Sequence, residues 1–470
     1  SSGYVEDTLE DIMNVNTKLA MTYKAQGGQG VSLSKIRPKG SLINGRYQSD
    51  GIVPIMEMFN KTTESIIQGG CIHENELVLT SEGYKEIKDI KIEDRVWTKE
   101  GFIKVNYVFD KGEQEVFEVV TSKGYSIRTT SDHKYCVDGF NSKKLSDLKI
   151  GDSINLISKH SFSEIIFDEL AYFLGVFNGD GYVTQKRNAG SITLHRSQKY
   201  IGDKLINIIN NLGFDAYYTN ENLPNALRVY LVKDFLDFLD SKGLLKNHAE
   251  DIVIPDFIMK GSDSIKASYI AGAFDSDGTI YSTGFKYNTI SKEYATQIHL
   301  ILGSLGFFPS LHTIERDETR QIMYEIRDSF RLGQCFIPSL KIDNQGIQFA
   351  KNSRYSTPYT IESENFSREE YKQLKKISKT DNIGLFTYLN AIHNIDGFKR
   401  SPMIYDSIIT IKSLGKAHVY DLSLESEHYF SCNNIYVSNS RKGALLISID
   451  IKHKEAETFL EIKSDITKIN

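Results

Sequence analysis

The chain has 470 residues, of which 40% are hydrophobic and 25% charged, a composition typical of folded, core-forming protein. It contains no apolar run long enough for a membrane helix, no signal-like start and no C-x-x-C pair. We therefore expect a cytoplasmic protein with no membrane partner, no zinc ribbon and no disulfide framework. Because 56 basic residues face 61 acidic ones, any nucleic acid must be bound by a local surface rather than by net charge.

The pattern of apolar and polar residues changes along the chain. A glycine-rich segment at residues 27–30 is followed, at residues 53–67, by apolar residues at the spacing of a helix. Residues 71–159 instead carry short alternating runs separated by turn signals, which indicates a compact all-β unit. The same pattern of short alternating runs returns after residue 404. The sequence therefore predicts an all-β domain interrupted by an insertion at residues 160–400.

The insertion contains an internal repeat, which indicates two similar α/β halves related by a pseudo-twofold axis. The first copy begins at residues 173–181 and the second at residues 270–278, and each is followed by two further matching short segments.

Small residues recur at every fourth position in both copies, so each set lies on one face of a helix and would let the two helices pack closely. The six residues are Ala171, Gly175, Gly179, Ser268, Gly272 and Ser276. Such packing would bring together the helix ends that carry Asp180 and Asp277. Two adjacent carboxylates suit Mg²⁺, which can hold the oxygens of a phosphodiester during cleavage. The alternative is that each Asp-Gly pair only ends a helix.

Both copies resemble the LAGLIDADG motif of homing endonucleases, and Asp180 and Asp277 match its metal-binding acidic position. Asn178 departs from the motif where the second copy keeps Asp275, and we expect modest consequences. The resemblance implies Mg²⁺-dependent cleavage of both strands of a DNA duplex, which is read by β-strands. Lys286 is a candidate for the family's charge-stabilising lysine; it could equally lie on a solvated strand face.

The flanking β segments resemble the two ends of an intein, with junctions at Gly70-Cys71 and Asn439-Ser440. A thiol at Cys71 can attack the preceding carbonyl and turn the amide into a thioester. That step needs an acid–base group at the amide nitrogen. Thr130 and His133 match the family's T-x-x-H element, so the resemblance gives His133 this role and Thr130 an orienting one.

The downstream residues fit the remaining steps of splicing, which needs no cofactor. Ser440 would accept the acyl group from Cys71, and Asn439 would cyclise onto its own carbonyl and cut the chain. Asp421 and His428 lie in the matching downstream block and are candidate activators. At Ser438 the family usually has a histidine, so we expect His428 to activate Asn439 in its place.

Joining residues 1–70 to 440–470 gives a sequence that resembles the catalytic subunit of ribonucleotide reductase, for example at residues 36–41 and 457–461. The new loop at the junction corresponds to that family's specificity loop, so the resemblance implies nucleotide ligands, ATP among them, for the spliced host. The family's radical-bearing cysteine motif is absent, and we expect a host fragment. Residues 449–470 look closer to adenosylcobalamin-dependent members than to those with a di-iron partner subunit.

The expected architecture is multidomain: an all-β splicing domain of the Hint type, interrupted by a LAGLIDADG endonuclease domain and flanked by α/β host segments. The boundaries are 1–70 and 440–470 for the host, 71–159 and 401–439 for the splicing domain, and 160–400 for the endonuclease. We expect the excised intein to be a monomer whose DNA target is the uninterrupted host gene.

Two alternatives remain open. An autoprocessing domain of the hedgehog type would cleave without ligating and would not require Asn439 with Ser440. A splicing intein could also carry a decayed endonuclease that only binds DNA. Three cysteines outside the junction, Cys136, Cys335 and Cys432, have no such context and are expected to be buried or incidental thiols.

Overall fold

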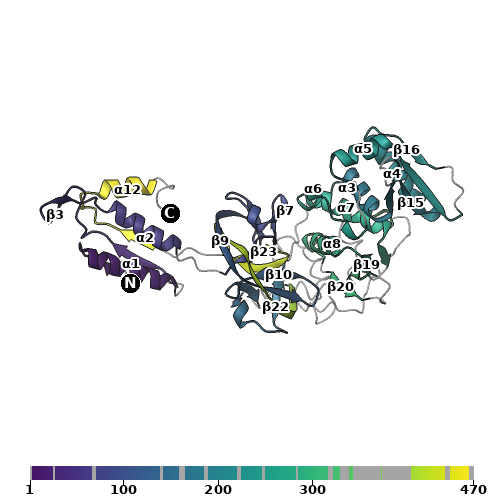
Figure 1. The fold of residues 1–470 in the computed structure, drawn as a ribbon. Coiled ribbons are helices and arrows are strands. Elements are labelled where there is room, and N and C mark those ends of the chain that lie inside the picture. Colours follow the sequence, from purple (N-terminus) through teal and green to yellow (C-terminus); the bar gives the residue numbers. More distant parts are fainter. Residues whose placement is uncertain are drawn as a thin grey trace.

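The computed structural model describes most of the chain. The described residues are 3–24, 27–65, 70–137, 141–157, 165–184, 189–219, 224–245, 249–281, 284–307, 309–315, 321–328, 338–341, 372, 404–439 and 445–464. Ser440 and Cys335 therefore lie outside the described residues. Within the described part, no helix is both long and apolar enough to cross a membrane. Figure 1 shows three bodies in a row, with the two termini together in the body on the left.

The middle body is a 12-stranded sheet whose strands come from both sides of the insertion. The strands before the insertion are β5 (Ile72–His73), β6 (Leu77–Thr80), β7 (Gly83–Glu86), β8 (Arg95–Thr98), β9 (Gly101–Thr121), β10 (Ser126–Thr129), β11 (Lys134–Val137), β12 (Asn141–Lys144) and β13 (Ser153–Leu156). Those after it are β22 (Ile404–Leu424), β23 (Tyr429–Cys432) and β24 (Ile435–Ser438). The topology therefore contains an all-β unit interrupted by an insertion, as predicted.

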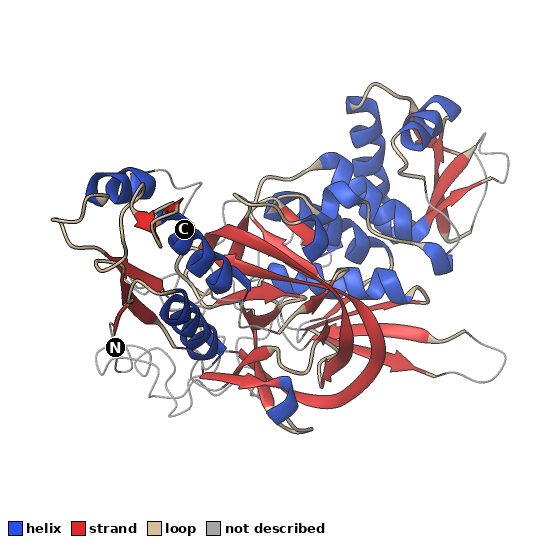
Figure 2. Cartoon of the chain, turned by 60° about the vertical axis from the view of Figure 1, so that its left-hand side comes forward, coloured by secondary structure: helices blue, strands red, loops and turns tan. Residues whose placement is uncertain are grey.

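Two long strands organise this sheet. Strands β9 and β22, of 21 residues each, pair antiparallel along almost their whole length, with irregularities such as the one between Ser413 and Gly415. Figure 2 shows them curving together through the sheet. Their alternating apolar residues, for example Val105, Val119 and Leu422, are buried in the core of the all-β unit. Strand β22 also pairs with β5, the strand that begins directly after Cys71.

The inserted part contains two α/β units of the same plan. The first comprises α3 (Glu169–Asp180), β14 (Gly181–Val183), β15 (Gly190–His195), α4 (Lys199–Asn211), β16 (Ala216–Tyr218), β17 (Ala226–Leu231) and α5 (Lys233–Ser241). The second comprises α6 (Asp256–Met259), α7 (Asp263–Ser276), β18 (Thr279–Tyr281), β19 (Gly284–Thr289), α8 (Lys292–Ser304), β20 (Ser310–Ile314) and β21 (Met323–Asp328). The sheets run β14-β15-β17-β16 and β18-β19-β21-β20, so their strand orders correspond.

Helices α3 and α7 pack along their small residues, as the spacing predicts. A Cβ added at Gly175 would overlap the backbone of Tyr269, and one at Gly272 would overlap the backbone of Tyr172. At the C-terminal ends, a Cβ on Gly179 would meet the side chain of Ser276. Only glycine permits so close an approach of the two helices.

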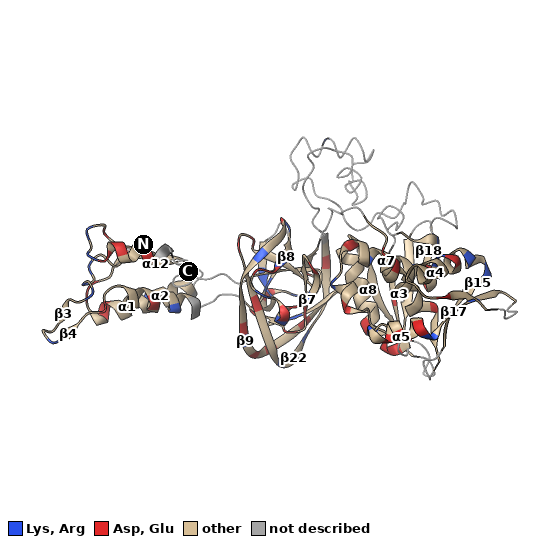
Figure 3. Ribbon diagram, turned by 90° about the horizontal axis from the view of Figure 1, so that it is seen from above, with Lys and Arg blue, Asp and Glu red and all other residues tan. Residues whose placement is uncertain are grey.

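The host segments fold together across the insertion. They comprise β1 (Gly3–Tyr4), α1 (Leu9–Lys24), β2 (Gln29–Ser32), β3 (Leu42–Ile43), β4 (Tyr47–Gln48), α2 (Val53–Ser65), β25 (Leu445–Ser448) and α12 (Ala456–Ser464). Strand β2 pairs in parallel with β25, which follows the insertion. The helix expected at residues 53–67 is α2. Figure 3 shows acidic and basic residues interspersed over all three bodies, in keeping with the net charge of −5.

Candidate functional site

Cys71 lies between two strands that each present a candidate residue. Register pairs Thr129 with Ile72 on one side and Tyr420 with Ile72 on the other, so the next positions bring Thr130 and Asp421 opposite Cys71. The Thr130 hydroxyl accepts the Cys71 N–H at 2.8 Å, and the Thr130 N–H donates to the Cys71 carbonyl at 2.9 Å. The nitrogen of the Gly70–Cys71 amide is therefore held by Thr130.

The Cys71 thiol is buried and protonated. Its exposed fraction is 3%, and it packs with Val116 and Val419. Burial, followed by the negative charge of Asp421, raises the pKa of the thiol to about 12. The thiolate that would attack Gly70 must therefore be generated by proton transfer, because it is not populated at neutral pH.

The backbone of His133 lies directly against Gly70. A Cβ on Gly70 would overlap the backbone of His133, so this glycine is required by a close approach. The imidazole is fully buried, and among the residues that the structure describes neither ring nitrogen has a partner of hydrogen-bond geometry. Burial lowers the pKa of His133 to about 4, although the nearby Gly70 backbone favours the protonated form. A neutral imidazole at this position can accept and return a proton.

Asn439 reaches the same place from β24. The pair Tyr135–Val437 joins β11 to β24, so two positions further along both strands His133 lies opposite Asn439. The Asn439 N–H donates to the His428 carbonyl, and its side-chain nitrogen donates to the Glu427 carbonyl, both at 2.8 Å. Within the described part of the chain, the buried side-chain oxygen of Asn439 has no hydrogen-bond partner. Gly70 and Asn439 thus lie beside the same histidine.

The remaining candidates are placed less closely. Asp421 is fully buried, and one of its carboxylate oxygens accepts the N–H of Leu422 at 2.7 Å. His428 is exposed, and its backbone carbonyl accepts the N–H of Asn439. Ser438 ends β24 beside Asn439.

Glu427 is a residue of this site that the sequence did not single out. Its carboxylate is buried, accepts the His428 N–H at 2.6 Å and lies 3.6 Å from the Lys99 ammonium. Its backbone carbonyl holds Asn439. The only signal in the sequence for Glu427 was that it directly precedes His428, a candidate residue.

Cys136 and Cys432 are buried thiols, as expected. Burial raises the pKa of Cys136 to about 12, and Asn155 donates to its sulfur at 3.2 Å. Cys432 lies in the core of the all-β unit.

A second candidate site lies where α3 and α7 end. Asp180 closes α3 and Asp277 caps α7, and a carboxylate oxygen of Asp277 is 3.0 Å from where a Gly179 Cβ would be. Two carboxylates at adjoining helix ends fit Mg²⁺, which takes few protein oxygens and completes its shell with water and phosphate. Within the described residues, no group of three or more histidine, cysteine, aspartate or glutamate side chains could hold a metal.

Two lysines of the inserted part differ in their relation to this acid pair. Lys286, on β19, forms an ion pair with Glu325 of β21. Lys341 is buried and donates to the carbonyls of Phe274, Ser276 and Gly278 at 2.9–3.0 Å. The charges of Asp180 and Asp277 act on Lys341, although burial is the larger effect and lowers its pKa. Sequence reasoning missed Lys341 because no pattern links it to α7.

Comparisons with known proteins agree with this arrangement. Residues 41–439 match the family model of the intein splicing domain, and residues 1–72 match that of the ribonucleotide reductase barrel domain. The chain is 24% identical over 437 residues to the ribonucleoside-diphosphate reductase NrdEB subunit alpha of Bacillus subtilis. That alignment covers 85% of this chain and 39% of the relative, so the chain spans about two fifths of the relative's length.

Two solved structures are also similar over parts of the chain. A DnaB intein from Synechocystis has a TM-score of 0.26 at 10% identity, covering 79% of this chain and 100% of that one. The homing endonuclease I-DmoI, in complex with DNA and Mn, has a TM-score of 0.29 at 12% identity, covering 36% and 97%. Scores this low establish no shared fold.

The match to the splicing-domain model extends over well more than half of the 470 residues, so the chain belongs to the intein family. More particularly, it is an intein inserted in a fragment of the ribonucleotide reductase barrel domain. This confirms the class that the junction residues and the flanking segments predicted.

Proposed function

We propose that the chain removes residues 71–439 by protein splicing and joins its two host segments. The observation that carries this proposal is the convergence on His133 of Gly70, which packs against it, and of Asn439, which the strand register places opposite it. Cleavage alone would need only the upstream half of this arrangement.

In the first step the Cys71 sulfur attacks the Gly70 carbonyl carbon. A C–S bond forms, the C–N bond breaks, and the thiol proton passes through His133 to the Cys71 nitrogen. Thr130 supports this transfer because its hydroxyl already holds that nitrogen, at 2.8 Å. Asp421, opposite Cys71, disfavours a free thiolate and so keeps the proton until attack.

In the following steps the Ser440 hydroxyl takes the acyl group and returns a proton to the Cys71 sulfur. The Asn439 side-chain nitrogen then attacks its own backbone carbonyl, forms a succinimide and releases the Ser440 amine, which captures the ester as an amide. The Glu427 carbonyl orients that attacking nitrogen. Because residue 438 is a serine, where the family usually has a histidine, residues 427–428 position Asn439.

Mass spectrometry of the expressed full chain tests this proposal. We expect two products, residues 71–439 with a terminal succinimide and residues 1–70 joined to 440–470. Cys71→Ala should leave the chain unspliced, whereas the control Cys136→Ala, another buried thiol, should splice. A wild-type chain that stays intact, or host pieces that are released but never joined, would contradict splicing, and the latter would favour the cleavage-only alternative.

We further propose that residues 160–400 form a homing endonuclease that cuts double-stranded DNA. The closely packed ends of α3 and α7, with Asp180 and Asp277, support this function. When bound there, Mg²⁺ would supply Lewis-acid stabilisation of the phosphodiester. These two carboxylates would hold the metal, and Lys341 would offset part of their mutual repulsion.

The test is cleavage of a duplex that carries the chain's own coding sequence with the segment for residues 71–439 removed. With Mg²⁺ we expect both strands to be cut, and Asp277→Asn should abolish cutting. Asp256→Asn is the control, because Asp256 is an exposed residue paired with Lys260. Binding without cutting by the wild type would favour the decayed endonuclease. Nucleotide binding by the joined host, and its class of radical cofactor, remain proposals for the longer protein.

A further inference from the structure

The buried carboxylate of Glu427 connects the two halves of the splicing domain. Glu427 lies after the insertion, in the turn that follows β22, and is 5% exposed. Its Oε2 atom lies 3.6 Å from the ammonium of Lys99, which is in the turn between β8 and β9 and so precedes the insertion. A buried carboxylate is costly unless it is paired and hydrogen-bonded. The partner of this carboxylate comes from the upstream half of the domain.

The other carboxylate oxygen acts on a single peptide group. The Oε1 atom of Glu427 accepts the N–H of His428 at 2.6 Å. The carbonyl of the same peptide group, which is that of Glu427, accepts the side-chain nitrogen of Asn439 at 2.8 Å. Because a peptide group is planar and trans, fixing its N–H also fixes the direction of its carbonyl. A charged acceptor on the N–H polarises the group as well and makes that carbonyl a stronger acceptor.

The next carbonyl of the turn holds the backbone of Asn439. Tyr429 pairs with Ser438, so the following position places Asn439 opposite His428. The His428 carbonyl accepts the Asn439 N–H at 2.8 Å. Two successive carbonyls therefore hold the backbone and the side chain of Asn439. Cyclisation needs the side-chain nitrogen at its own carbonyl carbon, so the direction of the Glu427 carbonyl decides how often the nucleophile is in place.

We propose that Glu427 is a positioning residue for the cyclisation of Asn439 and that Lys99 keeps its carboxylate in place. This inference rests on the proposed splicing function. In the step concerned, the Asn439 side-chain nitrogen bonds to its own carbonyl carbon, and the bond from that carbon to the Ser440 nitrogen breaks. One proton passes from the attacking nitrogen to the Ser440 nitrogen. Glu427 takes no part in these bond changes and acts through the peptide group that it orients.

The experiment measures the two cleavages of the full chain separately. In a Cys71→Ala chain, release of residues 440–470 reports the cyclisation of Asn439. In an Asn439→Ala chain, release of residues 1–70 by added dithiothreitol reports the thioester at Cys71. Mass spectrometry of timed samples gives both rates, and each further substitution is compared with these two parental chains.

Glu427→Ala should slow the release of residues 440–470 about tenfold to a hundredfold, because the turn loses a hydrogen bond to a charged group. Release of residues 1–70 should keep the parental rate. In the otherwise wild-type chain, the same substitution should accumulate the branched ester. Glu427→Gln should recover part of the loss, because an amide oxygen can still accept the His428 N–H. Glu425→Ala, which removes an exposed carboxylate from the same turn, is the matched control and should keep both parental rates.

The role of Lys99 is tested through its coupling to Glu427. Lys99→Met removes the ammonium and should slow the release of residues 440–470, by less than Glu427→Ala does. Combined with Glu427→Ala it should have no further effect, since the carboxylate that it holds is gone. An equal effect with and without Glu427 would overturn the role of Lys99.

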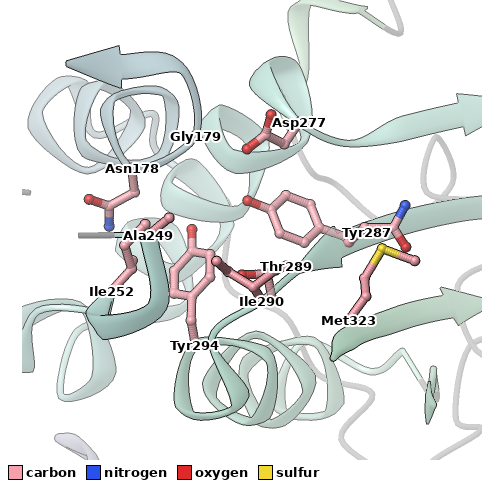
Figure 4. A pocket seen from close by; sticks show the side chains of 11 residues that line it. Asn178, Gly179, Ala249, Ile252, Asp277, Tyr287, Thr289, Ile290, Tyr294 and Met323 are labelled. Carbon is pink, nitrogen blue, oxygen red and sulfur yellow. The ribbon is translucent and has the colours of Figure 1, made fainter. Parts of the chain in front are cut away.

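DNA cutting provides a readout from the inserted part. The cavity beside Asp277, of about 580 Å³, is lined among the described residues by the inserted part, for example by Asn178 and Tyr294 (Figure 4). Glu427→Ala should therefore leave any cutting of DNA with Mg²⁺ unchanged. A chain that loses both cutting and cyclisation would be disturbed as a whole, and the positioning role would be overturned.

The outcomes separate this inference from the proposed splicing. If the wild type splices and Glu427→Ala neither slows the release of residues 440–470 nor accumulates the branched ester, the inference is overturned while splicing stands. If Glu427→Ala slows both releases equally, the residue supports the fold, and the positioning role is overturned. If the wild type stays intact, both proposals fail. Melting temperatures within about 2 °C of the parental chains exclude unfolding as the cause of slow release.

Discussion

At the scale of single residues, the junction depends on burial rather than on formal charge. Cys71 and His133 are both nearly inaccessible, and burial moves their pKa values in opposite directions, to about 12 and about 4. Both groups are consequently neutral across the physiological range. An uncharged pair avoids the cost of burying ions and leaves proton transfer to occur in concert with attack.

The first prediction concerns the ionisation of this thiol. In an Asn439→Ala chain, Cys71 should show no thiolate between about pH 6 and pH 9, because its pKa lies well above that range. Asp421→Asn should lower the pKa, although burial, the larger cause, keeps it above the ordinary thiol value. The measurement is the ultraviolet thiolate absorbance of each chain, minus that of its Cys71→Ala counterpart. A thiolate that titrates near pH 8.5 would contradict the buried, protonated thiol.

Cys71, Thr130 and Asn439 could be named from the sequence because the segments around them resemble the two ends of an intein, and the structure places Thr130 against Cys71. Glu427 and Lys341 could not, since each acts through contacts with backbone carbonyls or amides that are created only by folding. Lys341 reaches the end of α7 from 65 positions further along the chain, a separation that no local pattern encodes.

At the scale of elements, the endonuclease-like part depends on the contact between α3 and α7. The spacing of small residues predicted this contact because helical positions four apart share a face. The hydrogen bond between Tyr269 of α7 and Tyr294 of α8 could not be predicted, since it is created by tertiary packing.

The second prediction tests that helix contact. Gly272→Ala would place a methyl group into the Tyr172 carbonyl, so the helices must separate. We expect a loss of about 2–4 kcal/mol in stability of the inserted part and a loss of DNA cutting, while splicing continues. Gly3→Ala is the control, since no atom lies within 4 Å of a Cβ there. Thermal unfolding and plasmid cleavage measure both effects; an unchanged melting transition would show that the helices are not in tight contact.

A second element-scale feature is the contact between β24 and helix α8. The Asn434 side chain accepts from the Tyr84 hydroxyl at 2.5 Å and donates to the Leu300 carbonyl at 2.9 Å. Its backbone lies in the left-handed region, with φ of 63°, in the turn that leads into β24. The strand that leads to Asn439 is thereby braced by the inserted part.

The third prediction follows from this brace. Asn434→Ala would remove one partner each from the Tyr84 hydroxyl and the Leu300 carbonyl, which stay hydrogen-bonded to each other at 3.0 Å, and should destabilise the chain by about 1 kcal/mol. Cleavage at Asn439 should slow, whereas formation of the thioester at Cys71 should change less. Quenched time courses of the two cleavages provide the measurement. Tyr84→Phe should produce a smaller effect in the same direction, and additivity of the two variants would show that the contact does not couple the two parts.

At the scale of the whole molecule, the two host segments are already folded together, in one body at the end of the molecule (Figure 1). Residues before the insertion pair with residues after it, with Val31 opposite Ile447 in the parallel pair β2–β25. The Glu455 carboxylate accepts the N–H groups of Lys39 and Ile52, and the His453 imidazole is hydrogen-bonded to the Ile36 carbonyl at 2.7 Å. Because these contacts tether the two host segments, the ends to be joined are held at a high effective concentration.

The last prediction asks whether this assembly decides between ligation and simple cleavage. Val31→Asp would bury a carboxylate at a position that is 2% exposed and should separate β2 from β25. The branched ester would then be lost to water more often, so released but unjoined residues 1–70 should accumulate several-fold. Leu446→Asp, at a neighbouring position that is 64% exposed, is the matched control and should splice normally. Quantitative mass spectrometry of the joined and unjoined host pieces gives the ratio. If Val31→Asp splices as cleanly as wild type, the intein's own sheet must hold the two junctions together without help from the host.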